Sequence, residues 1–99
     1  MNLGKVVGMV VSTRKEESLE GLRLMLVKYV DEAGKETGSQ IVAADTVGAG
    51  PGEMVLVATG SSARQTVATD KRPCDAVIMA IVDSWNVGEK TLYRKSDED

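Results

Sequence analysis

The sequence contains no histidine, and this absence excludes several kinds of active site at once. Serine-histidine-aspartate triads, cysteine-histidine pairs and histidine-based metal centres all need an imidazole. The single cysteine, Cys74, cannot form a disulfide within the chain, which fits a reducing, intracellular setting. We expect a buried, unreactive thiol there, and we expect no metal and no cofactor.

Aromatic residues are almost as rare, because the 99 residues include no Phe, one Trp and two Tyr. The core must therefore be built from aliphatic side chains. A domain of this length buries only about 60–65% of the surface that its unfolded chain exposes, so its margin of stability is small. We expect one domain that gains stability by associating with further copies of itself.

Positive charge is also in deficit, because 12 Lys and Arg stand against 15 Asp and Glu, for a formal net charge of −3. This balance argues against general affinity for nucleic acid or for an anionic membrane. No apolar run approaches the ~20 residues that span a bilayer, and the N-terminal residues lack the layout of a signal peptide. We expect a soluble cytoplasmic protein.

Short segments rich in aliphatic and β-branched residues dominate what is present. They predict strands at residues 5–12, 22–30, 40–44, 53–59 and 76–82, with a further short strand at 91–95. Gly8 interrupts the first strand and predicts a bulge or tight curvature there. One short helix is predicted at 61–68, with Gly60 and the following serines as N-cap. The pattern predicts a mainly β protein, a compact curled sheet or barrel with one short helix.

A glycine-rich segment at residues 45–52 raises the question of phosphate binding. Its glycines, Gly48, Gly50 and Gly52, are two residues apart, whereas a dinucleotide fingerprint needs G-x-G-x-x-G and a P-loop needs GKS or GKT. The segment also leads into a predicted strand and not into a helix. We therefore interpret it as a turn between strands, in which glycine supplies positive φ and permits close approach of other backbone.

The GSSAR segment opens the predicted helix with Ser61, Ser62, Ala63 and Arg64. A helix N-terminus favours an anion, but nothing nearby in the sequence could activate a serine hydroxyl. We interpret the segment as a helix start whose Arg64 forms an ion pair, either within the subunit or across a subunit boundary.

Four carboxylates, Asp45, Glu53, Asp75 and Asp83, fall at the ends of predicted strands. Turn-forming acids usually occupy such positions. A hydrolase with paired carboxylates would need two of them facing each other in a cleft, and so short a barrel has little room for one. This constellation does not favour an enzyme.

Three segments, read in order, carry a family resemblance: KVVGMVVSTRK, ADTVGAGPGEMVLVATGSSARQ and RPCDAVIMAIVDSWNV. Together they resemble the EutN/CcmL family, the pentameric vertex proteins of bacterial microcompartment shells. The likeness runs from the first strand to Val87. Cys74 departs from it, because a small aliphatic residue is expected there, and the charged tail GEKTLYRKSDED matches no motif of the family.

The resemblance implies an OB-like, five-stranded β-barrel: one domain over residues 1–99, with a C-terminal extension from about residue 88. It implies a homopentamer without catalytic activity or cofactor, in the shell of a compartment in the cytoplasm. The implied partners are further copies of the chain and hexameric or trimeric shell proteins, with no nucleic acid and no membrane. Among compartments we lean to a catabolic one, a metabolosome, over a carboxysome.

The resemblance also implies two groups of site residues. The glycine-rich turn would lie near the five-fold axis, where small residues tolerate crowding by five converging backbones: Asp45, Val47, Gly48, Ala49, Gly50, Pro51 and Gly52. The helix start would stiffen the subunit or its contact with a neighbour: Ser61, Ser62, Ala63 and Arg64.

Two other functions stay open on the residues alone. An OB-type module that binds single-stranded nucleic acid would need a basic groove with aromatic platforms, and the aromatics are Trp85, Tyr29 and Tyr93. A small enzyme would need an activated nucleophile. We prefer the structural shell protein to both.

Overall fold

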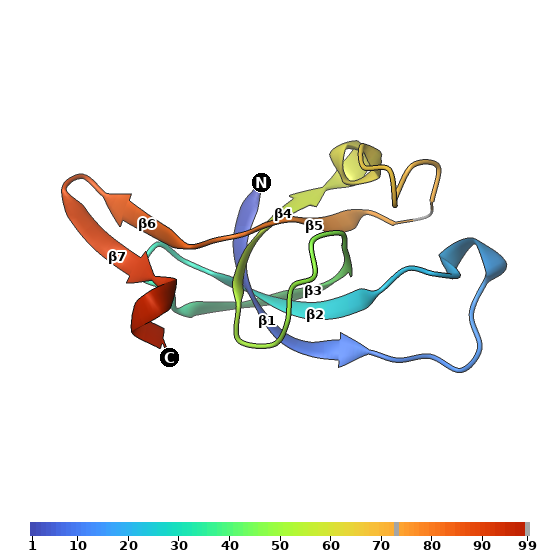
Figure 1. The fold of residues 1–99 in the computed structure, drawn as a ribbon, viewed down its shortest axis with the longest axis horizontal. Helices are drawn as coiled ribbons and strands as arrows, with labels where there is room; N and C mark the ends of the chain where they lie inside the picture. The colour runs from blue at the N-terminus through green and yellow to red at the C-terminus, as the bar shows by residue number, and fades with distance from the viewer. Residues whose placement is uncertain (73, 99) are drawn as a thin grey trace.

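Five strands of the computed structural model close into a barrel with the order β1-β2-β3-β5-β4, and β4 returns to β1 (Figure 1). The structure describes residues 1–72 and 74–98, so Pro73 lies outside it. Neighbouring strands are antiparallel except β3 and β5, which are parallel. The barrel strands are β1 (Asn2–Val10), β2 (Leu24–Val30), β3 (Glu36–Asp45), β4 (Met54–Thr59) and β5 (Ala76–Ile81). The prediction of a mainly β, five-stranded barrel is confirmed.

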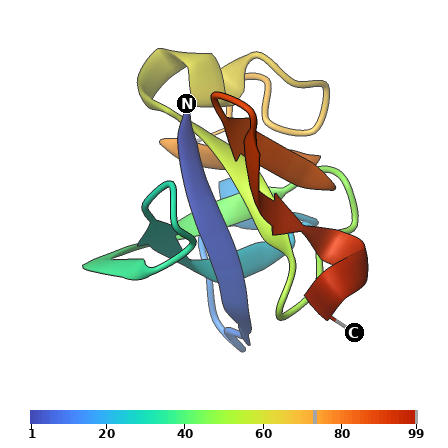
Figure 2. The ribbon, with the colours of Figure 1, turned by 90° about the vertical axis from the view of Figure 1, so that its left-hand side faces the viewer.

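The interior is aliphatic, as the composition requires. Figure 2 looks along the long axis and shows the strands arranged around the interior of the barrel. Gly4 lies in the barrel wall, where only glycine fits. A Cβ at that position would collide with the side chain of Val27. The central, fully buried side chains are those of Val6, Met25, Val27, Ala43, Val55, Val57 and Ile78.

The bulge predicted at Gly8 is present. The pairing of β1 with β2 shifts by one residue between Val6 and Gly8. A bulge increases the twist and bends its strand. β1 can therefore pair with β4 through residues 2–5 and continue with β2 as far as Val10.

The predicted helix is present only as a 3-10 helix, η2 (Gly60–Arg64), and it is shorter than expected. The residue before it, Thr59, is the N-cap, and its side chain makes no capping bond. Downstream, the buried hydroxyl of Thr69 donates to the carbonyl of Ala63 at 2.7 Å and also pairs with the Thr66 hydroxyl. Such local side-chain bonds compete with helical hydrogen bonds and end the helix early.

A second, two-stranded sheet follows the barrel. It consists of β6 (Ser84–Val87), which the sequence did not predict, and β7 (Lys90–Arg94), close to the predicted strand. Trp85 stacks on Tyr93 with ring centroids 4.6 Å apart. The hairpin packs through Tyr93 against Val30 and Met54 of the barrel. The extension expected from residue 88 thus begins in the turn of this hairpin.

Two further short elements complete the chain: η1 (Glu17–Leu19), in the polar loop after β1, and η3 (Lys95–Glu98), after β7. β3 begins four residues before the predicted strand. The turn before it is closed by Asp31, whose carboxylate accepts the backbone N–H groups of Ala33 and Lys35.

Candidate functional site

The glycine-rich turn joins β3 to β4 and folds against β1 at the barrel wall (Figure 1). The N–H of Gly52 donates to the carbonyl of Val6 at 2.7 Å, and the N–H of Val6 donates to the carbonyl of Glu53 at 3.0 Å. Ala49 is fully buried in the barrel core. The turn is therefore a fixed part of the subunit.

Asp45 holds the first half of the turn. Its Oδ1 accepts the N–H groups of Val47 at 3.1 Å and Ala49 at 3.2 Å. Its Oδ2 lies 2.5 Å from Nη1 of Arg23, and its side chain is 1% exposed. Because Asp45 and Ala49 are turned inward, both act within the subunit.

Glu53 holds the second half. Its Oε1 accepts the N–H of Gly50 at 2.7 Å, and its Oε2 lies 2.5 Å from Nζ of Lys95. The hydrogen bond from Lys95, followed by that from Gly50, lowers the pKa of Glu53. The same bond to Glu53 raises the pKa of Lys95. The start of η3 is thus tied to the turn.

The three glycines of the turn differ in whether the structure of the subunit requires glycine at their positions. Gly48 and Gly52 have φ of +79° and +91°, a region that side chains rarely adopt, so the prediction of positive-φ glycines is confirmed for these two. Gly50 lies outside that region, and a Cβ there would meet Oε1 of Glu53 at 3.7 Å, an ordinary contact. Nothing within the described subunit requires glycine at position 50.

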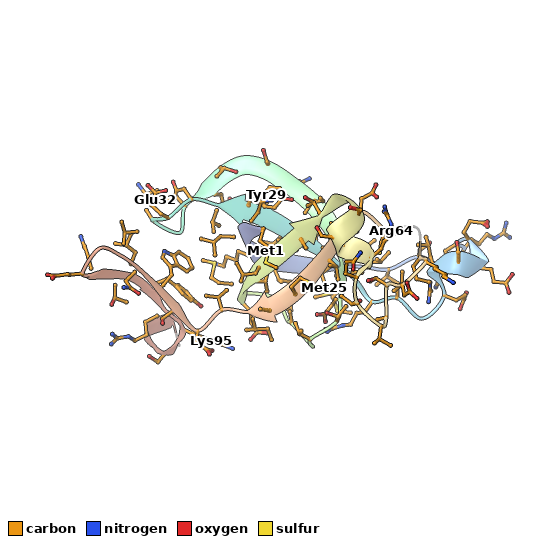
Figure 3. The ribbon with its side chains drawn as sticks, turned by 90° about the horizontal axis from the view of Figure 1, so that it is seen from above. Met1, Met25, Tyr29, Glu32, Arg64 and Lys95 are labelled. Carbon is orange, nitrogen blue, oxygen red and sulfur yellow. The ribbon has the colours of Figure 1, made fainter. Side chains whose placement is uncertain are left out.

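The GSSAR segment lies beside β4 and β5. Ser61 and Ser62 are exposed, and the hydroxyl of Ser62 donates to the carbonyl of Thr59 at 2.7 Å. Ala63 is fully buried. Nη1 of Arg64 lies 3.0 Å from Oδ1 of Asp75, so the predicted ion pair of Arg64 forms within the subunit. Figure 3 shows Arg64 and Lys95 toward opposite ends of the molecule.

Three of the four strand-end carboxylates are each paired with a cation: Asp45 with Arg23, Glu53 with Lys95 and Asp75 with Arg64. Over residues 1–72 and 74–98 no cluster of three or more potential metal ligands occurs. In the same residues no helix is long and apolar enough to cross a membrane.

Cys74 differs from the expected buried thiol. It is partly exposed and packs at the edge of an apolar cluster that contains Ala44, Ala63 and Val77. Partial burial raises the pKa of its thiol, which disfavours the reactive thiolate.

Sequence reasoning missed Arg23 and Lys95 as supports of the turn. They are 22 and 42 residues away from the carboxylates that they contact. No local pattern marks these two cations among the twelve Lys and Arg of the chain. The fold alone brings them to the turn.

Comparison with known proteins gives concordant matches. The family model described as "Ethanolamine utilisation protein EutN/carboxysome" matches residues 1–83. The carboxysome shell vertex protein CcmL of Gloeobacter violaceus is 46% identical over 98 residues, 99% of this chain and 98% of that protein. The solved structure of Gloeobacter violaceus CcmL superposes with a TM-score of 0.94 at 46% identity, over 98% of this chain and all of that one. A structure described as the GrpN pentameric microcompartment shell protein of Rhodospirillum rubrum superposes with a TM-score of 0.81 at 48% identity, over 88% of this chain and 99% of that one.

Proposed function

This chain belongs to the EutN/CcmL family, and on that premise we propose that five copies of it form a ring that caps a vertex of a bacterial microcompartment shell. The observation that carries the proposal is the near full-length similarity to a protein named as a shell vertex protein, in sequence and in fold. The pentameric description of the Rhodospirillum rubrum structure supports the number five. The relatives are named as shell vertex proteins, and this membership bears out the expectation of a protein that is not an enzyme.

A ring of five fits the geometry of closed shells. Six-fold units tile a flat layer, and five-fold units are needed to close that layer into a shell. A cyclic ring uses heterologous contacts, in which one face of each subunit meets a different face of the next. We expect the surrounding shell proteins to be hexameric or trimeric, and we expect no nucleic acid among the partners. The catabolic compartment stays a prediction, since the relatives include carboxysome proteins and others.

We place the glycine-rich turn at the five-fold axis. Its exposed Val47, Gly48, Pro51 and Gly52 would face the other copies, together with the partly exposed Gly50. Asp45 and Ala49 would support the turn from within. A Cβ at position 50 has room within a single subunit, so we expect any restriction to glycine there to come from neighbouring copies. The GSSAR residues would stiffen the subunit or its contacts with a neighbouring copy.

Binding of single-stranded nucleic acid, the alternative for this fold, has no support from the aromatic residues. Trp85 and Tyr93 stack on each other, and Tyr29 packs against the barrel core. A stacking platform for bases needs an uncovered aromatic face. A gel shift with a single-stranded oligonucleotide at physiological salt should therefore show no complex.

Native mass spectrometry tests the proposal directly. At low micromolar concentration the protein should have five times the mass of its 99-residue chain. A spectrum that contains monomers or dimers alone would overturn the proposed ring.

A further inference from the structure

The second half of β1 is an uncovered apolar edge. The pairing of β4 with β1 ends at Lys5, and residues 8–10 pair with β2 in the described structure. Val7, Met9 and the following Val11 are 37%, 54% and 83% exposed. An exposed, apolar strand edge is a template for association, and soluble proteins normally cover or charge it.

The side chains of this edge point in two opposite directions. Met9 lies opposite Met25, whose fully buried side chain faces the barrel interior, so Met9 is on that side of the sheet. Val10 lies opposite Leu24, which lies opposite Ala44 of β3. Because successive side chains alternate, this second row is on the outer face.

The outer face contains an apolar groove of about 450 Å³. The charged residue that lines this groove, Asp75, forms an ion pair with Arg64 of the same subunit. The side chain of Val42, on this outer face, is 47% exposed. The groove is lined by Leu19, Leu24, Val42, Ala44, Cys74 and Ala76, among others.

We propose that these two surfaces are the halves of one contact between copies of this chain: the Met9 side of β1 from one subunit packs into the groove of the next. This inference rests on the proposed ring and names its surfaces. A ring needs two different faces on each subunit that point in different directions, and the two sides of the β1–β2–β3 sheet meet that condition. Both surfaces are apolar, so a second copy matches the groove in chemistry.

The native Cys74 makes the contact testable, because it lines the groove. A Met9→Cys variant would bring a second thiol to the groove of the neighbouring subunit. A short bis-maleimide, which tolerates imprecise placement better than a disulfide does, should link each chain to the next. Under denaturing electrophoresis the variant should give a ladder of covalent species up to a pentamer. Val11→Cys is the second variant, at a more exposed position that should tolerate the change.

Two controls separate this contact from chance cross-linking. Wild type, with Cys74 alone, should give no species larger than a dimer. Val87→Cys places the added thiol on the exposed β6–β7 hairpin, at the far end of the molecule from η2 (Figure 1), and should give no ladder.

A charge in the groove gives a second readout. Val42→Glu should raise the concentration at which half of the chains are assembled by about tenfold or more, because an apolar contact would then bury an unpaired carboxylate. Val87→Glu should leave that concentration unchanged. If wild type and both cysteine variants are pentamers without a ladder, the proposed surfaces are wrong although the ring stands. If wild type itself is not a pentamer, the proposed function fails first.

Discussion

The guanidinium of Arg23, just before β2, lies 2.5 Å from the carboxylate of Asp45, the last residue of β3. The Asp45 side chain is 1% exposed and also accepts two N–H groups of the glycine-rich turn. One carboxylate therefore links two strands to the conformation of that turn.

Replacing Asp45 by alanine should lower the free energy of unfolding by about 1–3 kcal/mol, because it leaves Arg23 and the N–H groups of Val47 and Ala49 without this acceptor. Urea unfolding at one fixed protein concentration measures the change, since assembly also contributes to stability. The exposed Asp83 provides the matched control: Asp83→Ala should change the free energy by less than about 0.5 kcal/mol. Equal effects of the two substitutions would contradict this role of Asp45.

Gly50→Leu should impair ring formation while leaving the fold of the subunit intact. The backbone at Gly50 is outside the positive-φ region, and a Cβ there has room. Gly48→Ala is the contrasting variant, because φ of +79° should make it cost about 1 kcal/mol or more in folding. Native mass spectrometry reports the ring and circular dichroism reports the fold. Pentamers of Gly50→Leu in wild-type yield would refute the crowded axis.

The pair of Glu53 and Lys95 predicts a pH dependence with a definite sign. The pKa of Glu53 is lowered in the folded chain, mainly by Lys95. The contribution of Glu53 to folding stability is therefore present above the ordinary carboxyl pKa, and it is lost as the pH falls through the lowered pKa of the folded state. The pKa of Lys95 is raised, so the lysine side of the pair is lost only as pH rises through its folded value in strong alkali.

Thermal unfolding of wild type and Glu53→Gln at a series of pH values checks this dependence. Wild type should be more stable than the variant at neutral pH, and the difference should vanish in acid. Glu89→Gln, in the exposed turn of the β6–β7 hairpin, should show no such convergence. A constant difference between wild type and Glu53→Gln across the series would contradict the pair.

Trp85→Ala should loosen the β6–β7 hairpin from the barrel. The indole stacks on Tyr93, and its Nε1 donates to the carbonyl of Glu32 at 2.8 Å. Isolated two-stranded hairpins are marginally stable in water, so we expect a loss of about 2 kcal/mol from the stack and the hydrogen bond together. Limited trypsin digestion should cut the variant faster at Lys90 or Arg94, whereas Val87→Ala should be cut at the wild-type rate.

The sequence was sufficient for the five barrel strands, because each is a run of aliphatic residues with a buried face. The first four residues of β3, ETGS, were missed because both faces of that segment are exposed and polar. β6 was missed for a related reason, since SWNV is short and has no clear alternation. The extent of the helix was misjudged because Thr69, five residues after Arg64, takes the carbonyl of Ala63.

The residues of the candidate site likewise divide into those that the sequence predicts and those that only the fold reveals. Gly48 and Gly52 could be predicted because positive φ is a local property of a turn. The inward position of Ala49 could not, because nothing in its neighbours distinguishes it from an exposed alanine. The ion pair of Arg64 was expected, and its partner Asp75 emerged only from the fold.

The irregular step between Val6 and Gly8 fixes the orientation of everything after it in β1. If regular pairing simply continued, Gly8 would lie opposite Met25 and Met9 would lie opposite Leu24, on the outer side. The extra residue reverses that assignment and leaves Gly4 and Val6 undisturbed in the interior. The one added residue thus turns the side chain of Met9 to the inner side of the sheet without changing the packing of the barrel core.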